Sequence, residues 1–367
     1  MNEAIVIGAD HHNTLGVIRS LGRKGVSLRL ILVPAQGKPF VTASRYIDDV
    51  ITLRSENELP SVLGNIEHDN IIVLFSCSDK VSAVLDENRN TLESAGYVVP
   101  GTTDSRGLVY YMNKDIMAEY AVSSGLHVPK CGIEDYPLVA KPRRSISGSK
   151  DDIRILGNKE DYMRYASSHR SMDIQYQQFI DKDFEYQLIG CSLNHGDDVI
   201  IPGVSVILRQ PDNTNTGFLK YRLLDASFPI AECRRFLQGI SFSGLFSMEF
   251  LRGKDGQDYF MEINLRNDGN AICVTESGVN LPYVWYLSSI GKPWKNETSN
   301  QVHSIIVMPE FDDFRDSVLK GKISFFRWMK DVQRTDCFMD YAPDDKAPFF
   351  VKFRNEAIRY CKKLLKR

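Results

Sequence analysis

The stretch GLFSMEFLRGKDGQDYFMEINLR, residues 244–266, contains two runs of alternating apolar and polar residues joined by a cluster of turn residues. Asp255-Gly256 between two such runs is a strong β-hairpin signal. A loop of two or four residues centred on this dipeptide places Glu249 opposite Glu262, whereas a three-residue loop would break that register. The sequence therefore predicts an antiparallel hairpin in which two glutamates face each other.

Facing carboxylates repel each other unless a cation lies between them. Because side chains alternate along a strand, Glu262, Asn264 and Arg266 project from one face together. A divalent ion shared by Glu249, Glu262 and Asn264 would remove the repulsion, and oxygen ligands suit Mg²⁺, which usually arrives with nucleotide phosphates. The alternative is a polar face in water. The apolar residues of this strand are expected to be buried: Met261, Ile263 and Leu265.

The composition is that of an ordinary folded protein, with 367 residues, 43% hydrophobic residues and a formal net charge of -2. This length allows two or three domains, and the charge gives no reason to expect nucleic acid as a partner. The seven cysteines form no C-x-x-C pair, which favours reduced thiols in a cytoplasm over a zinc site or disulfides. We see neither a signal peptide nor an apolar stretch long enough to be a transmembrane segment.

Residues 1–103 are expected to form an α/β domain, because continuous apolar strands alternate there with helical segments, as in a parallel sheet covered on both faces. The first turn, GADHHNTLG, lacks the glycine spacing of a dinucleotide site, which disfavours a nicotinamide enzyme. The carboxyl ends of the strands bring Asp10, His11 and the SCSDK loop at 76–80 near a possible ligand crevice. For His11 and His12 the favoured interpretation is loop residues without chemistry, since single histidines carry no spacing information.

Residues 104–300 are expected to form a second, α+β domain, and residues 301–367 a C-terminal extension with a basic amphipathic helix. The apolar residues of that helix follow helical spacing and are expected to pack on the rest of the chain. The alternative is a helix that touches an anionic membrane or a partner. The apolar set comprises Phe353, Ala357, Cys361, Leu364 and Leu365.

Two further segments have the features of a nucleotide site. In YPLVAKPRRSISGSKDDIRIL a strand ends near Lys141, and a Ser/Gly loop follows whose backbone N–H groups can bind phosphate. Such a loop is also typical of a plain hairpin connection. In QQFIDKDFE the extended QQFI can hold an adenine and Glu185 a ribose, although many surface strands look the same. The loop residues are Ser145, Ser147, Gly148 and Ser149.

Taken in order, these segments resemble the ATP-grasp superfamily. The order is Lys114 in NKD, Lys141 in VAKP, the Ser/Gly loop, QQFIDKDFE, and then MEF with MEINLR. More narrowly, the chain resembles carboxylate-amine ligases related to D-aspartate ligase and to the carbamoyl-phosphate synthetase large chain. The resemblance covers roughly residues 4–290 and implies a parallel-sheet pre-ATP-grasp domain followed by an ATP-grasp domain.

The resemblance also implies roles for individual residues. Lys141 and Arg266 would be catalytic, with Arg266 facing the transferred phosphoryl group. Three departures from the family pattern are Gln178 at a commonly acidic position, a loop with Gly148 alone, and Ser247 where relatives have an arginine. Arg266, Arg252 and Arg222 are the alternatives for that arginine. ATP would contact Lys114, Lys141, Ser145, Ser147, Gly148, Gln178, Phe179, Ile180 and Glu185, and Mg²⁺ or Mn²⁺ would bind Glu249, Glu262 and Asn264.

The activity implied is ATP-dependent formation of an amide or peptide-like bond through an acyl phosphate, from a small-molecule carboxylate and an amine. The alternatives are an ATP-binding protein without ligase activity, and a carbamoyl-phosphate-type or thiol-acceptor ligase. A homo-oligomer is possible. Arg209, Lys220 and Arg222 indicate either an anionic substrate or a solvated hairpin face.

Overall fold

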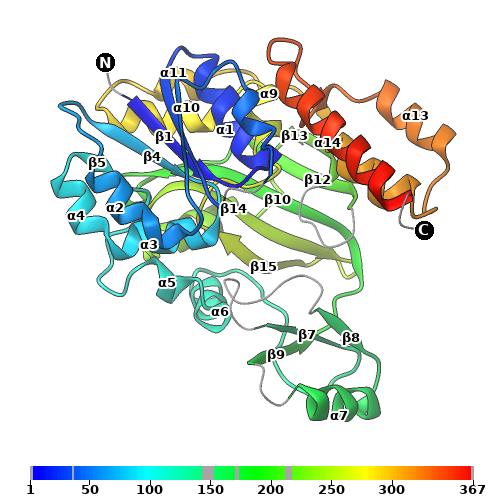
Figure 1. Cartoon of the computed structure of the whole chain (residues 1–367). Helices are drawn as coiled ribbons and strands as arrows, with labels where there is room; N and C mark the ends of the chain where they lie inside the picture. Colours follow the sequence, from blue (N-terminus) through cyan, green and yellow to red (C-terminus); the bar gives the residue numbers. More distant parts are fainter. Residues whose placement is uncertain (1–2, 35–36, 143–152, 170–172, 211–216, 365–367) are drawn as a thin grey trace.

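The fold is described from a computed structural model of the chain (Figure 1), over residues 3–34, 37–142, 153–169, 173–210 and 217–364. The predicted phosphate-loop residues Ser145, Ser147, Gly148 and Ser149 lie outside these ranges. Within the described ranges there are three sheets: one of five strands, one of nine and one of three.

The N-terminal sheet is parallel, as predicted, with the order β3-β2-β1-β4-β5. Alternate residues of β1 enter different cores: Ala4 and Val6 pack with helix α1 (His12–Gly22), and Ile5 and Ile7 with α2, α3 and α4. Helices therefore cover both faces, which explains the continuous apolar strands. The other bounds are β1 (Glu3–Gly8), β2 (Ser27–Leu32), β3 (Asp49–Thr52), β4 (Ile72–Ser76), β5 (Tyr97–Val98), α2 (Leu59–Gly64), α3 (Asp79–Glu87) and α4 (Arg89–Ser94).

The nine-stranded sheet forms the centre of the molecule and is antiparallel except for the β16–β17 pair. Its main path is β15-β14-β10-β12-β13-β16-β17, with β11 and β6 attached to β10 and β14. Helices α5 (Leu108–Tyr111), α6 (Lys114–Ser123) and α8 (Ile230–Gly239) pack on one face over an aromatic core. The strands are β6 (Gly101–Thr102), β10 (Lys182–Leu193), β11 (Asp198–Ile200), β12 (Gly203–Arg209), β13 (Phe218–Leu223), β14 (Phe242–Gly253), β15 (Asp258–Asn264), β16 (Ile305–Met308) and β17 (Cys337–Phe338).

The hairpin of β14 and β15 confirms that Glu249 pairs with Glu262, although not through the expected loop. The Gly253 N–H donates to the Gln257 carbonyl at 2.9 Å, which leaves a three-residue loop with a left-handed glycine. That loop alone would shift the register by one residue. A bulge at Met261 restores the register, because Phe250 pairs with Phe260 while Glu249 still pairs with Glu262.

The bulge also corrects the predicted burial of this strand. Phe260 is 2% exposed and takes the core position. The prediction that Met261 is buried is wrong, since Met261 is only half-buried. The predictions for Ile263 and Leu265 are confirmed, because both side chains are buried.

The three-stranded sheet stands apart from the two larger sheets and has the order β8-β7-β9 (Figure 1). Its strands are β7 (Leu138–Pro142), β8 (Arg154–Leu156) and β9 (Ile174–Gln178), and helix α7 (Lys159–Ser168) covers it. Its core is small: the buried residues are Leu138, Ala140, Leu156 and Ile174.

After α9 (Ile272–Glu276), α10 (Leu281–Ser289) and α11 (Lys295–Thr298), the chain adds β16 and β17 to the large sheet. The C-terminal segment is fastened to helix α1, where buried Arg19 donates through Nε to Asp345 at 3.1 Å and through Nη2 to the Asp340 carbonyl at 2.8 Å. The helices of the extension are α12 (Glu310–Asp313), a π-helical turn (Phe314–Val318), α13 (Phe325–Gln333) and α14 (Ala347–Leu364).

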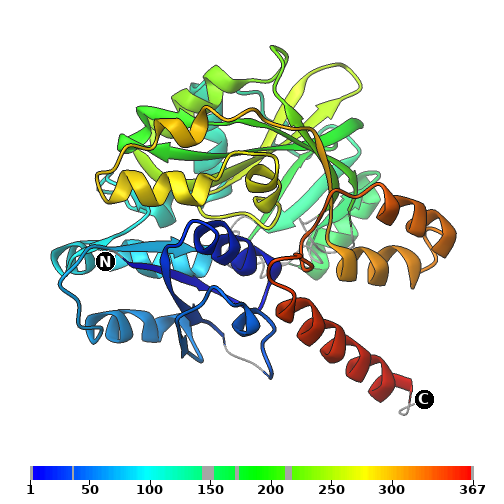
Figure 2. The ribbon, with the colours of Figure 1, turned by 90° about the horizontal axis from the view of Figure 1, so that it is seen from above.

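The expected packing of the last helix on its own chain is wrong. Phe353, Ala357 and Cys361 are all exposed, and α14 projects from the body of the molecule (Figure 2). Leu364 and Leu365 are not among the side chains described. Among the described helices, none has the length and apolar character needed to cross a bilayer.

Candidate functional site

The two facing glutamates lie on β14 and β15, the two strands at one edge of the large sheet. Glu249, on β14, is 8% exposed and accepts hydrogen bonds from Asn264 Nδ2 at 3.2 Å and Gln187 Nε2 at 3.3 Å. Glu262, on β15, is partly exposed. Two carboxylates on paired strands with amide donors beside them form an oxygen-rich site that favours a bound cation.

Lys114 stands at the first position of helix α6, beside this pair. Asn113 caps the helix, its side chain accepting from the Asp115 N–H at 2.9 Å, and so fixes where α6 begins. The helix packs on β15, where the Ile263 N–H donates to Met117 Sδ. Lys114 Nζ consequently lies 3.8 Å from Glu262 Oε2.

Lys141 extends from β7 of the small sheet toward the same place and is 7% exposed. Burial, with the positive charge of Lys114 beside it, lowers the pKa of Lys141 to about 8. A buried ammonium group next to a second lysine is unfavourable unless anions neutralise it. Glu249 and Glu262 supply part of that negative charge, and a polyanionic ligand would supply more.

Asn264 and Arg266 continue the polar face of β15. Asn264 Oδ1 accepts from Arg266 Nη2 at 3.0 Å, while its amide nitrogen points to Glu249. To act as a metal ligand, the Asn264 amide must turn so that its oxygen faces the metal. Burial opposes the charge on Arg266, but the carboxylates of Asp79 and Asp268 raise the pKa of its guanidinium above the usual value.

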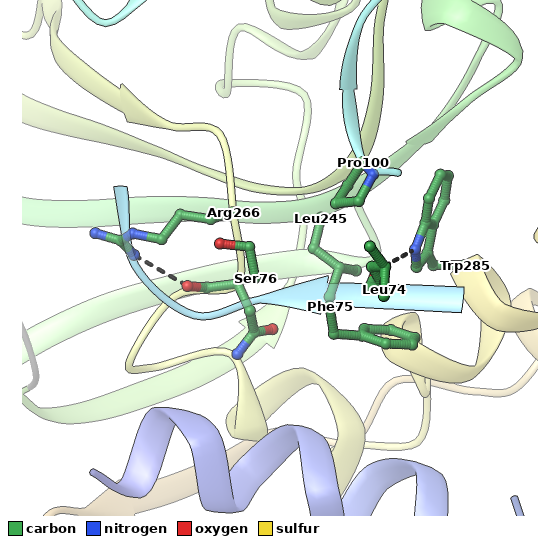
Figure 3. Close-up of a pocket in the computed structure, with 8 residues that line it drawn as sticks. Leu74, Phe75, Ser76, Pro100, Leu245, Arg266 and Trp285 are labelled. Atoms are coloured by element: carbon green, nitrogen blue, oxygen red, sulfur yellow. Dashed lines mark hydrogen bonds between the residues drawn. The ribbon is translucent and has the colours of Figure 1, made fainter. Parts of the chain in front are cut away.

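Arg266 also joins the site to the N-terminal domain. Its Nε lies 3.0 Å from Asp79 Oδ1, which brings the predicted SCSDK loop to the site. Next to it, the Asn267 N–H donates to the Ser76 carbonyl, and Asn13 Nδ2 donates to the Asn267 carbonyl, both at 3.1 Å. Arg266 and Trp285 flank the end of β4 around a hollow of about 10 Å³ (Figure 3), a far smaller space than a ligand pocket.

The predicted adenine segment connects β9 to β10. The Gln178 N–H donates to the Lys130 carbonyl at 2.8 Å, and the Phe179 N–H to the Pro137 carbonyl at 3.1 Å. Within the described residues, the Ile180 N–H makes no such bond and so is the amide available to a base. Glu185 pairs with Lys182 at 2.9 Å.

Two of the alternative arginines are occupied elsewhere. Arg252 Nη2 donates to Asp258 Oδ2 at 2.8 Å, and Arg222 Nη1 to Asp225 Oδ2 at 3.0 Å. Both guanidinium groups lie over the ring of Phe228. Arg266 is thus the alternative that adjoins the glutamate pair.

Arg209 is also committed to pairs within the chain. It lies 2.7 Å from Asp313 and 2.8 Å from Asp331, both of the C-terminal extension. These two ion pairs hold the extension on β12. Because Arg209 is already neutralised by them, it gives no support to the prediction of an anionic substrate.

Two residues that support the site were missed from the sequence. Gln187, directly opposite Glu249 on β10, is itself held by Asn270 Nδ2 at 2.7 Å. Gln175 Nε2 donates to Asp115 Oδ1 at 2.7 Å and so ties the small sheet to α6 beside Lys114. The alternating glutamines of β9 are a signal for Gln175, but they do not identify its partner, and Gln187 stands alone among apolar residues of β10.

The ligand set fits a metal that shares its coordination with phosphates. Within the ranges described, no group of three or more histidine, cysteine or acidic residues could hold a metal alone. Glu249, Glu262 and Asn264 supply oxygen donors only, which is the chemistry of Mg²⁺. Lys114 and Lys141 beside them would repel an isolated metal but suit a metal bound to phosphate.

Comparison of the sequence with family models and with curated proteins finds no match. Solved structures, however, match most of the chain. An L-amino acid ligase from Bacillus licheniformis matches with a TM-score of 0.63 and 15% identity, over 82% of this chain and 78% of that one. An N5-carboxyaminoimidazole synthetase from Staphylococcus aureus matches with a TM-score of 0.64 and 15% identity, over 88% and 85%.

A third match is the biotin carboxylase domain of 2-oxoglutarate carboxylase from Hydrogenobacter thermophilus, solved as a dimer with MgADP, ADP and bicarbonate. It has a TM-score of 0.63 and 14% identity, over 82% of this chain and 73% of that one. At such identities the likeness establishes the fold. The chain has the ATP-grasp fold, which confirms the predicted fold class, and the narrower kinship with D-aspartate ligase stays a prediction.

Proposed function

We propose that this protein is an ATP-dependent carboxylate-amine ligase that works through an acyl phosphate. The observation that carries the proposal is the convergence of Glu249, Glu262, Lys114, Lys141 and Arg266 on one edge of the ATP-grasp fold. The names of the structural neighbours support it: an amino acid ligase, a carboxyaminoimidazole synthetase and a biotin carboxylase domain with MgADP.

In this proposal Glu249, Glu262 and Asn264 hold Mg²⁺, which when bound neutralises phosphate charge and aligns the reacting oxygens. Lys114 and Lys141 bind the phosphates of ATP as point charges. The Ile180 N–H and the apolar surroundings of the segment hold the adenine, and Glu185 the ribose. The protein's work is therefore positioning and charge neutralisation, as expected for phosphoryl transfer.

Arg266 would face the group being transferred, because it joins Asn264 to the end of the first domain. A carboxylate substrate bound there would attack the terminal phosphorus of ATP, releasing ADP. An amine would then attack the acyl carbon and expel phosphate. No nucleophilic serine or cysteine is needed for either step.

The test is Mg²⁺-dependent phosphate release from ATP across a matrix of L- and D-amino acids, small amines and simple carboxylic acids. A ligase releases phosphate only with one particular pair. ATP binding without stimulated release by any pair would contradict the proposal and favour a binding protein.

With the active pair, heavy oxygen placed in the substrate carboxyl group should appear in the released phosphate, because the acyl phosphate transfers that atom. Unlabelled phosphate would remove the acyl-phosphate step. A product that contains a thioester or a carbamoyl group would show that the amine is not the acceptor and would favour a thiol-acceptor or carbamoyl-phosphate-type ligase.

A further inference from the structure

Two helices of the C-terminal extension expose large aromatic side chains. On α13, Phe325 is 50% and Phe326 80% exposed. On α14, Phe350 is 59% and Phe353 56% exposed. Grouped exposed rings of this size mark a contact surface, whereas single exposed apolar residues do not. We call these four phenylalanines and the basic residues around them the aromatic-basic surface.

The apolar stripe of α14 is exposed, and the rings of Phe350 and Phe353 contact that of Phe349 on the same helix. The C-terminal part of the helix extends beyond the body of the protein (Figure 2), although Asn355 Nδ2 still donates to the Lys38 carbonyl at 2.8 Å. Most side chains from Phe353 onward are exposed. The spacing of Phe350, Phe353, Ala357 and Cys361 places these residues on one face of the helix. An exposed apolar face of this kind indicates that the helix binds another surface.

The same helices carry concentrated positive charge, although the whole chain has a net charge of -2. Arg354 and Lys362 are exposed on α14, and Arg327 and Lys330 on α13, while Arg359 of α14 pairs with Glu356. The acidic residues in contact with α13 are buried and paired, as Asp313 and Asp331 are with Arg209. The surface presented outward is thus cationic.

Aromatic contacts hold the two helices on one support. Phe349 of α14 packs on Phe311 of α12 with ring centroids 5.1 Å apart. Trp328 of α13 packs on Phe314 of the π-helical turn at 5.0 Å. Because α12 leads directly into that turn, both helices belong to one unit, and the two helices lie on the same side of the molecule in Figures 1 and 2.

We propose that the aromatic-basic surface binds the face of an anionic lipid bilayer. Exposed phenylalanines with lysines and arginines are the composition of helices that lie in the bilayer interface. A second copy of this chain fits less well, since a symmetric contact would bring the same cationic residues face to face. This inference is independent of the ligase proposal.

The test is co-sedimentation of the full chain with vesicles of phosphatidylcholine alone and of phosphatidylcholine mixed with phosphatidylglycerol. We expect binding to the mixed vesicles that is at least about tenfold tighter and that weakens as salt is added. The double variant Phe350→Ser/Phe353→Ser should lose roughly tenfold or more of that affinity. Val122→Ser, which changes a similarly exposed apolar residue on α6, should bind like the wild type.

The charge contribution is tested separately. Arg354→Gln/Lys362→Gln should weaken binding by about tenfold or more, because two charges near the lipid surface are lost. Lys159→Gln/Arg164→Gln removes two exposed charges from α7 and should change nothing. Thermal melts show whether each variant is folded, and Phe326→Ser replaces the double phenylalanine variant if that one is not.

Equal binding to both kinds of vesicle, or no binding to either, would overturn the proposal. Sedimentation velocity adds a further outcome. A dimer that Phe350→Ser/Phe353→Ser dissociates, in a protein that ignores vesicles, would make the surface an interface between copies and would equally overturn it.

Discussion

The proposed ATP site has two halves that are built very differently. Glu249 and Glu262 stand on the nine-stranded sheet, over a core that contains the stacked rings of Tyr186 and Phe250. Lys141 and the adenine segment belong to the three-stranded sheet, whose core consists of Leu138, Ala140, Leu156 and Ile174.

The difference in core size between the two sheets suggests that each sheet has a separate role in the proposed site. The large sheet fixes the proposed metal ligands, because β14 is buried along most of its length. The small sheet has little apolar burial of its own, so its local stability is lower and its position depends on links such as Gln175 to Asp115. We infer that the metal half is preformed and that the phosphate-binding half is ordered by the nucleotide.

The largest expected effect comes from the metal half. Glu262→Ala should lower Mg²⁺-dependent ATP turnover by roughly a thousandfold, because one of two carboxylate ligands is lost. Steady-state phosphate release measures it. Glu119→Ala, which removes an exposed glutamate from α6, should behave as the wild type. Turnover of Glu262→Ala at the wild-type rate would remove the metal assignment.

The next effect comes from the small sheet. Lys141→Met should weaken ATP binding by about tenfold to a hundredfold while leaving the large sheet folded, because one phosphate-binding charge is lost. Titration calorimetry gives the affinity, and Lys159→Met on the exposed face of α7 is the matched control. Unchanged affinity in Lys141→Met would mean that this lysine does not bind the phosphates of ATP.

A smaller effect concerns pH. Burial and the neighbouring Lys114 lower the pKa of Lys141 to about 8, so its charged form is lost as pH rises through that value. ATP affinity should then fall by up to about tenfold per pH unit above pH 8. In Lys141→Arg the decline should flatten, since an arginine keeps its charge. An equal decline in both proteins would assign the titration to another group.

The smallest expected effect is a difference in amide hydrogen exchange between the two sheets. Backbone amides of β7 and β9 should exchange with solvent at least about tenfold faster than those of β10 and β14. Mg²⁺ with ATP should slow exchange in the small sheet far more than in the large one. Hydrogen exchange read by mass spectrometry tests this, and equal protection of both sheets would contradict the division between a preformed and an ordered half.

Much of the fold could be predicted because local patterns determine it. Continuous apolar strands indicate the parallel sheet, and alternation on both sides of Asp255-Gly256 indicates the hairpin. The pairing of Glu249 with Glu262 is confirmed, yet it depends on a bulge at Met261 that compensates for a three-residue loop. The three-residue loop and the bulge shift the strand register in opposite directions. Their effects cancel, so the alternation of apolar and polar residues does not reveal either of them.

Contacts between distant segments could not be predicted in this way. Arg266 meets Asp79, and Asn13 meets Asn267 across 254 positions, because the whole fold brings these loops together. The exposed face of α14 was also beyond reach, since helical spacing shows which residues share a face but not whether that face is covered. The domain limits at residues 103 and 300 and the roles of the site residues stay predictions.

The most direct test of the central claim is a calorimetric titration of ATP into the wild-type chain, once with Mg²⁺ and once with a chelator. The account predicts one saturable site per chain, at least about tenfold weaker without the metal, since Glu249 and Glu262 then repel the phosphates. Equal affinity under both conditions, or no binding under either, would contradict a metal-nucleotide site between the two sheets.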